Sequence, residues 1–398
     1  MSTPTALHLA VALDGAGWHP AAWREKEARP AELLTAPYWT DLVQEAERGL
    51  LDFVTIEDSL GLQSSHFDGP DTRTDQVRGR LDAVLIAARV APLTSRIGLV
   101  PTATVTHTEP FHISKAVATL DFVSSGRAGW RAQLSLPSQD SHFGRRQSPR
   151  FRRADFDKPE VLAAMVDRFD EAADFVEVVR RLWDSWEDDA EIRDVATGRF
   201  IDREKLHYID FEGRWFNVRG PSIVPRPPQG QPLVTALAHA PVVYRFGARS
   251  ADVVYVTPHD VSDVRAITGQ IRAETEAAGR AGETVHVFGD LVVFLDQTAA
   301  AARERRSRLD EVAGKAYASD ALIYVGTPDD LATLLQEWQE AGLSGFRLRP
   351  ATIPQDLEAI TRGLVPELQH RGVFRTSYEA STLRGLLGLP RPANRYAA

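Results

Sequence analysis

The feature that most constrains the fold of this chain is a regular alternation of short β-branched runs with longer segments of helical periodicity. Strands and helices that alternate in this way form parallel βαβ units, because a parallel strand can be reached only by a crossover connection. About eight such units can be counted, which is the number that closes a (βα)8 barrel. The alternation therefore predicts an α/β fold, a single (βα)8 TIM barrel with insertions.

The expected strands are the short apolar runs at 7–13, 53–56, 97–100, 130–136, 233–237, 253–256, 285–295 and 346–348. The expected helices lie at 37–50, 81–93, 113–122, 162–186, 242–250, 264–278, 298–313, 328–341 and 355 to about 362. Insertions are predicted at about 138–160 and 187–230, the second with a hairpin at 207–218, and a C-terminal tail at about 371–398. We expect residues 1–398 to form one barrel domain.

Charge and composition exclude several classes of protein. A net charge of −9 is the opposite of the basic footprint of a nucleic-acid-binding protein. The absence of cysteine excludes disulfides, thiolate metal sites and cysteine nucleophiles. The 11 histidines are scattered, so no metal site is predicted. No run approaches the ~18 apolar residues of a membrane helix, and we expect a cytoplasmic protein that binds no membrane.

The active site of such a barrel lies at the carboxyl ends of its strands. Polar residues occur at these expected ends, at 14, 57–58, 102–104, 133–135, 239 and 257–259. His107, His142 and His239 lie near them and are weak candidate proton donors, because a buried, hydrogen-bonded structural histidine is the commoner explanation of each alone. Arginines gather at 145–153, as either an anion-attracting lid or a solvated loop. For any single residue a turn or helix-capping role is the commoner explanation.

Several segments match a known family. The most specific is Thr-Leu-Asp-Phe at 119–122, followed by Ser-Gly-Arg-Ala-Gly-Trp at 125–130. Further matching segments lie at 22–24, 45–49, 52–53, 96–99, 182–186, 365–368, 371–372 and 382–384. Together they span about residues 8–392. The chain resembles the bacterial-luciferase-like flavin monooxygenases, in the branch of nitrilotriacetate monooxygenase component A and dibenzothiophene-sulfone monooxygenase.

The resemblance implies a luciferase-like barrel that takes reduced FMN from a separate flavin reductase and uses O2 to oxidise a small organic substrate in a water-poor pocket. It implies cofactor-binding roles for three residues. Asp58 matches the family's acidic flavin contact after the second strand, and Thr102 and Thr104 match the threonine-rich end of the third strand. It also implies a homo-oligomer, either a dimer or a tetramer.

Departures from the family pattern all concern the flavin. Arg131 stands where the family has asparagine, and 165–169 lacks the histidine and tyrosine of His-x-x-Arg-Tyr. Residues 236–243 lack the serine and glycines of the family's phosphate loop. Losing two or three charge-assisted contacts weakens binding by about 3–6 kcal/mol, or two to four powers of ten. We predict weak FMN binding, which Arg131, an arginine of 145–153 or His239 is placed to offset.

Two functions therefore remain open at this stage. The first is a two-component FMN-dependent monooxygenase. The second is a luciferase-like paralogue with a degenerate FMN site, which acts without FMN or as a non-catalytic partner subunit. The visible spectrum of the protein with added FMN, oxidised and then reduced, separates the two.

Overall fold

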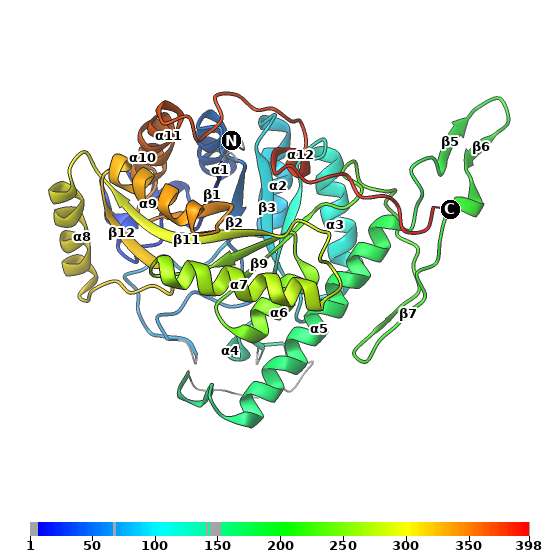
Figure 1. Cartoon of the computed structure of the whole chain (residues 1–398), viewed down its shortest axis with the longest axis horizontal. Coiled ribbons are helices and arrows are strands. Elements are labelled where there is room, and N and C mark those ends of the chain that lie inside the picture. Colours follow the sequence, from blue (N-terminus) through cyan, green and yellow to red (C-terminus); the bar gives the residue numbers. More distant parts are fainter. Residues whose placement is uncertain (1–6, 67–68, 141, 144–152, 398) are drawn as a thin grey trace.

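The computed structural model describes residues 7–66, 69–140, 142–143 and 153–397, and its centre is a closed barrel of parallel strands (Figure 1). The eight strands are β1 (His8–Leu13), β2 (Phe53–Ile56), β3 (Gly98–Thr104), β4 (Gly129–Gln133), β9 (Leu233–Ala238), β10 (Val253–Val256), β11 (His286–Leu295) and β13 (Gly345–Pro350). They pair in the order β10-β9-β4-β3-β2-β1-β13-β11, and β11 pairs back to β10 and closes the ring. The predicted TIM barrel is confirmed, and each of the eight predicted strands forms part of the barrel wall.

Helices surround the barrel, because each strand is buried on both faces and needs a cover on the outside. The covering helices are α1 (Ala36–Arg48), α2 (Ala83–Val90), α3 (Pro110–Val123), α5 (Pro159–Asp184), α6 (Pro241–Ser250), α7 (Val261–Ala277), α8 (Ala299–Ala313), α9 (Pro328–Glu340), α10 (Gln355–Ala359) and α11 (Val365–His370). Between α10 and α11 the π-helical turn Ile360–Leu364 continues the helix beyond its predicted end. In the described part of the chain, no helix combines the length and the apolar character needed to cross a membrane.

A ninth strand, β12 (Leu322–Gly326), was not predicted from the sequence. The first half of the ten-residue β11 pairs with β10, and its second half pairs with β12. β12 therefore extends the sheet beside the carboxyl-terminal half of β11, past the point where β10 ends. This extension holds the loop before β12 beside the mouth of the barrel.

The amino-terminal end of the barrel is closed by the C-terminal tail. Leu383, Leu387 and Leu389, in and after α12 (Leu383–Leu386), pack against Phe53 and other residues inside the barrel. A Cβ at Gly98 would lie 2.5 Å from Leu383 Cδ1 and 2.8 Å from Phe53 Cβ, so glycine at the start of β3 lets both residues pack closely against the strand. The tail is thus part of the core at this end of the barrel.

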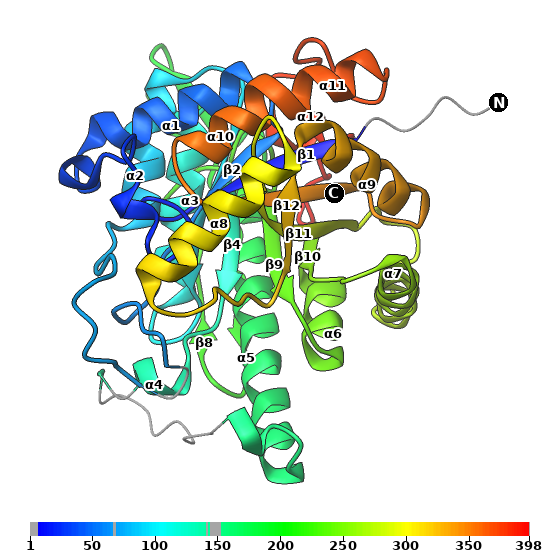
Figure 2. The same cartoon turned by 90° about the vertical axis from the view of Figure 1, so that its left-hand side faces the viewer.

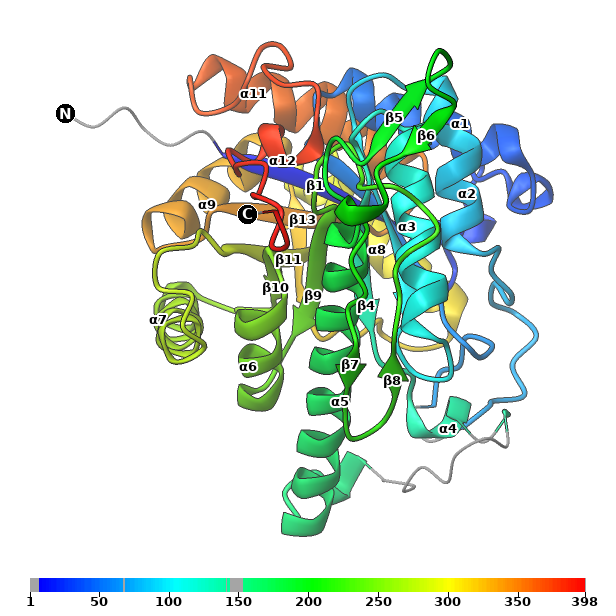
Figure 3. The ribbon, with the colours of Figure 1, turned by 90° about the vertical axis from the view of Figure 1, so that its right-hand side faces the viewer.

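The predicted insertions lie on two sides of the barrel. The first contains α4 (Pro137–Asp140), beside the carboxyl ends of the strands (Figure 2). Residues 144–152, which include most of the predicted arginine cluster, lie outside the described residues. The second insertion forms two hairpins, β5–β6 (Glu191–Asp194 and Arg199–Ile201) and β7–β8 (Phe211–Glu212 and Asn217–Val218). β7–β8 lies along α5, whereas β5–β6 lies beyond the C-terminal end of that helix (Figure 3). β7–β8 is the hairpin predicted at 207–218.

Candidate active site at the carboxyl ends of the strands

Two of the predicted flavin contacts, Asp58 and Thr104, lie beside Gln133 at the ends of β2, β3 and β4. β3 pairs with β2 on one side and with β4 on the other, so Asp58, Thr104 and Gln133 lie at the ends of adjacent strands. The side-chain amide of Gln133 donates to the backbone carbonyl of Asp58 at 3.2 Å. Asp58, Thr104 and Gln133 therefore form one polar surface at the barrel mouth; the sequence predicted a cofactor contact for the first two only.

Asp58 has a structural task at this surface. Its Oδ1 accepts from the backbone N–H of Ser59 at 2.7 Å, and its Oδ2 accepts from that of Ala83 at 3.0 Å. Burial raises the pKa of Asp58 above its ordinary value, and these two hydrogen bonds act in the opposite direction. The carboxylate joins the end of β2 to the first residue of α2, and each oxygen keeps a further lone pair for another donor.

Thr102 and Thr104 are both buried on β3. Thr102 accepts a hydrogen bond from Nε of Arg131 at 2.9 Å. The backbone carbonyl of Thr104 accepts from the Thr108 hydroxyl at 2.6 Å. Thr102 is therefore engaged inside the barrel, whereas Thr104 lies one layer nearer the mouth.

Five buried charged side chains lie inside the barrel below the mouth, and none of them was predicted as a network from the sequence. They are Glu57, Arg131, Asp290, Arg347 and Arg349. A sixth, Asp320, is 45% exposed in the loop before β12 and pairs with Arg349. Asp290 accepts from Nε of Arg347 at 2.8 Å and from Nε of Arg349 at 3.0 Å. Burial alone would raise the pKa of Asp290, but the two arginines outweigh it and hold the pKa below its ordinary value. The sequence feature that could have revealed the network is Asp290, the one carboxylate in the apolar strand β11, together with Arg347 and Arg349 on the same face of β13.

Arg131 belongs to this network, which corrects its proposed role as a phosphate ligand. Its guanidinium pairs with Glu57 and is only 3% exposed. Arg347 approaches the same carboxylate at 3.4 Å. A guanidinium that is buried and already paired with a carboxylate cannot also bind a phosphate at the protein surface. Of the three groups proposed to compensate for the lost phosphate contacts, Arg131 is therefore not available.

The loop aligned with the phosphate-binding segment offers few donors. Ala240 caps α6 without a side-chain hydrogen bond, and Pro241 has no N–H. The N–H groups of Val243 and Tyr244 both donate to the carbonyl of Ala240 at 2.9 Å. Nearby on α5, the ring of Phe169 packs on Phe246 with centroids 5.6 Å apart. This end of the mouth is predominantly apolar.

The three candidate histidines have different surroundings. His142 is exposed, and His239 is 44% exposed at the mouth, with Nδ1 3.6 Å from Asp320. Partial burial lowers the pKa of His239. His107 is buried: its ring is 2% exposed, and its Nε2 lies 2.9 Å from Oδ1 of Asp140. Only His107 combines burial with a carboxylate partner.

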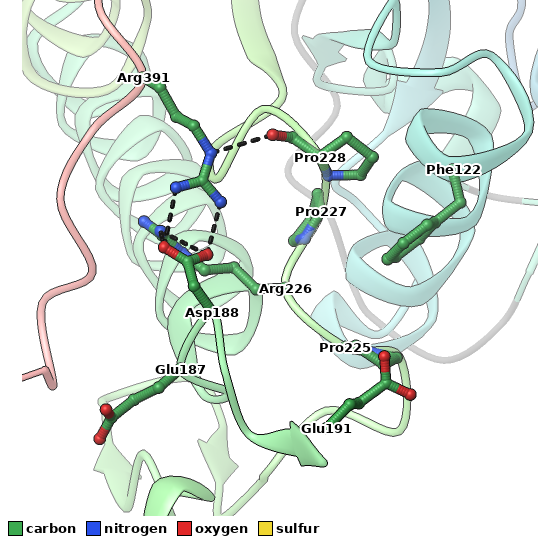
Figure 4. Close-up of a pocket in the computed structure, with 9 residues that line it drawn as sticks. All are labelled: Phe122, Glu187, Asp188, Glu191, Pro225, Arg226, Pro227, Pro228 and Arg391. Atoms are coloured by element: carbon green, nitrogen blue, oxygen red, sulfur yellow. Dashed lines mark hydrogen bonds and ion pairs between the residues drawn. The ribbon is translucent and has the colours of Figure 1, made fainter. Parts of the chain in front are cut away.

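A separate cavity of about 460 Å³ lies at the opposite, amino-terminal end of the barrel (Figure 4). It lies between the last turn of α3, at Phe122, and the segment 225–228 that precedes β9. Arg226 and Arg391 both bind Asp188, each with a contact of 2.8 Å. The two guanidinium groups that line the cavity are therefore neutralised by Asp188. None of the predicted site residues lines this cavity.

Comparison with known proteins agrees with this geometry. Residues 17–345 match the family model of luciferase-like monooxygenases. The chain is 31% identical to N-acetyl-S-(2-succino)cysteine monooxygenase of Bacillus subtilis over 98% of each chain. It is 30% identical to nitrilotriacetate monooxygenase component A of Aminobacter aminovorans over 96% of each. The crystal structure of long-chain alkane monooxygenase shares the fold, with a TM-score of 0.86 at 24% identity over 97% of this chain and 96% of that one.

The chain belongs to the luciferase-like monooxygenase family. The resemblance drawn from the sequence motifs is thereby confirmed, including the branch that contains the nitrilotriacetate enzyme. Both of these relatives, aligned over nearly the whole length, are monooxygenases, so the chain belongs to a family of oxidoreductases. The dibenzothiophene-sulfone monooxygenase of Rhodococcus erythropolis, at 28% identity over 93% of each chain, belongs to the same group.

Proposed function

We propose that this protein is the oxygenase of a two-component system, which uses reduced FMN from a separate reductase and O2 to oxidise a small organic substrate. The observation that carries the proposal is the polar surface of Asp58, Thr104 and Gln133 at the strand ends. It stands where barrel enzymes hold their ligands, in a chain of the luciferase-like family. The sequence has no Gly-x-Gly-x-x-Gly after its first strand, which supports a separate source of electrons.

The residues at the mouth fit the ring of a flavin better than its phosphate. The ring edge needs donors and acceptors, which the Gln133 amide, the Thr104 hydroxyl and the spare lone pairs of Asp58 supply. The phosphate needs charge-assisted donors, and the segment around Ala240 and Pro241 supplies few. This asymmetry supports a flavin that is held loosely and exchanged with a reductase.

When bound, reduced FMN would supply the two electrons that the reaction with O2 requires. The protein's own contribution would be to orient the ring against the ends of β2, β3 and β4 and to keep water away from it. The buried charge network beneath the mouth would hold these strand ends rigid. Its three arginines are balanced by the buried Glu57 and Asp290 and by the 45% exposed Asp320, so these side chains together would add no net charge below the ring.

Calorimetric titration with oxidised FMN, and with reduced FMN under anaerobic conditions, tests this proposal. We expect dissociation constants of tens to hundreds of micromolar, with tighter binding of the reduced form. Absence of binding of either form at millimolar concentration would contradict the function. Micromolar or tighter binding would contradict the weak phosphate contact alone and leave the monooxygenase function intact.

The substrate is to be sought among the compounds that its relatives oxidise. A panel of N-acetyl-S-(2-succino)cysteine, nitrilotriacetate, dibenzothiophene sulfone and dimethyl sulfide covers carboxylated and apolar candidates. Each is incubated with the protein, reduced FMN and O2, and products are identified by mass spectrometry. An oxygenated product that depends on the protein is the expected result.

A further inference from the structure

The backbone and the side chain of His107 are both in unusual environments. The residue has φ +62°, a left-handed conformation that side-chain-bearing residues adopt at a cost. Glycine would suit this backbone better, yet the chain places an imidazole there and buries it to 2% exposure. Strained positions that persist in a fold are concentrated at functional sites. The strained backbone therefore indicates that the imidazole ring of His107 has a functional role.

One ring nitrogen of His107 is held, and the other has no partner. Oδ1 of Asp140 accepts from Nε2 at 2.9 Å, which places the proton of the neutral ring on Nε2. Nδ1 is buried and has no hydrogen-bond partner among the described residues. A carboxylate on one nitrogen and a vacant lone pair on the other is the arrangement by which an aspartate orients a histidine base.

Asp140 is itself fixed by residues from two other elements. It accepts from the Ser135 hydroxyl, just after β4, and pairs with Arg168 of α5 at 3.1 Å. Arg168 also donates to the backbone carbonyl of Ser135 at 2.7 Å. The ring of His107 stacks on Phe143 with centroids 5.0 Å apart. Carboxylate and ring are therefore oriented before any ligand arrives.

This pair lies next to the predicted flavin contacts. His107 follows the end of β3 by three residues, and Ser135 follows Gln133 by two. Thr108, the next residue, bonds the carbonyl of Thr104. Gln139, beside Asp140 in α4, contacts the loop after Asp58, because a Cβ at Gly61 would lie 2.9 Å from it. The pair is thus built onto the same three strand ends.

We propose that His107 is the proton-transferring residue of the active site, with Asp140 as its positioning residue; this rests on the monooxygenase function proposed above. Monooxygenation inserts one atom of O2 into the substrate and releases the other as water, with two electrons from reduced FMN. The oxygen atom that becomes water must receive protons. Nδ1 of His107 accepts one proton from the reacting groups and returns it to that oxygen, so the residue ends the turnover unchanged.

The charged groups that face His107 in the described residues are few. Asp140 approaches from α4, and Arg168 of α5 reaches it through Asp140. Arg168 therefore shares the Asp140 carboxylate with the ring of His107.

The decisive variant is His107→Gly, because glycine is favoured at φ +62° and the lost ring leaves space for free imidazole. With the substrate that responds in the panel, we expect product formation to fall about a hundredfold or more. Added imidazole should restore a substantial part of it, with a pH dependence that follows the added base. His112→Gln is the matched control, an exposed histidine five residues away that should leave activity unchanged. Asp140→Asn should lose activity without rescue by imidazole.

A second measurement needs neither flavin nor substrate. In protein labelled with ¹⁵N-histidine, the His107 signals are assigned by their absence from His107→Gly. We expect the neutral ring to carry its proton on Nε2. A proton on Nδ1, or full activity of His107→Gly, would overturn the proposal. If neither form of FMN binds, the monooxygenase function fails, and the NMR result still decides whether Nδ1 is available as a base.

Discussion

Replacing Asp290 by asparagine should be one of the most destabilising single changes in the barrel. The Asp290 side chain is fully buried and accepts hydrogen bonds from both Arg347 and Arg349. Removing its charge leaves one net positive charge inside the barrel. Breaking a buried ion pair in this way typically costs about 3–5 kcal/mol.

The structure places the expected value toward the lower end of that range. Arg349 keeps Asp320 at 2.7 Å, and Arg347 keeps Glu57 at 3.4 Å, so neither guanidinium is left without a carboxylate. We therefore expect a loss of about 3 kcal/mol in the free energy of unfolding. Equilibrium unfolding in urea, followed by circular dichroism and tryptophan fluorescence, measures it.

The matched control for this prediction is Asp329→Asn. Asp329 also pairs with an arginine, Arg371, but its side chain is 69% exposed. A surface pair of this kind contributes about 0–1 kcal/mol. If Asp290→Asn lost no more stability than Asp329→Asn, the argument that the network rigidifies the mouth would be refuted.

Three further predictions follow from single sites. Burial alone would raise the pKa of Glu45, but hydrogen bonds, chiefly from Arg362, outweigh it and lower the pKa from 4.5 to about 2. Its stabilising contribution is therefore present above pH 4.5 and lost as the pH falls toward 2, so wild type should lose stability more steeply than Glu45→Gln in urea titrations between pH 5 and 3. Ala240→Ser should add the missing cap of α6, raise stability by about 0.5–1 kcal/mol and tighten FMN binding in calorimetry; unchanged FMN affinity would show that this loop does not face the phosphate. Asp58→Ala should weaken reduced-FMN binding by about 1–3 kcal/mol, and unchanged affinity would leave Asp58 with its capping role alone.

The fold could be predicted from the sequence because buried strands are short apolar segments and the helices between them have helical periodicity, and both patterns are visible locally in the sequence. Each barrel strand is a short apolar run, and the crossover helices fix their parallel direction. β12 left a similar trace at Leu322–Gly326 but was missed, since it pairs only with the extended half of β11. Its existence depends on the length of another strand, which local patterns do not encode.

The candidate site was only partly predictable, for a related reason. The strand-end residues Asp58 and Thr104 could be identified from their position and the family motifs. The pairing of His107 with Asp140 joins residues 33 positions apart, and Arg347 reaches Glu57 across 290 positions. Such contacts depend on barrel closure and side-chain length, so the sequence suggested a free role for Arg131 that its burial beside Glu57 removes.

The most direct test of the central claim is a labelled single turnover. The protein is mixed under anaerobic conditions with reduced FMN and the responding substrate, and then exposed to ¹⁸O₂. We predict one ¹⁸O atom in each product molecule, and no product when reduced FMN or the protein is omitted. Product oxygen that comes from water instead, or product formed without reduced FMN, would contradict the assignment of this chain as an FMN-dependent monooxygenase.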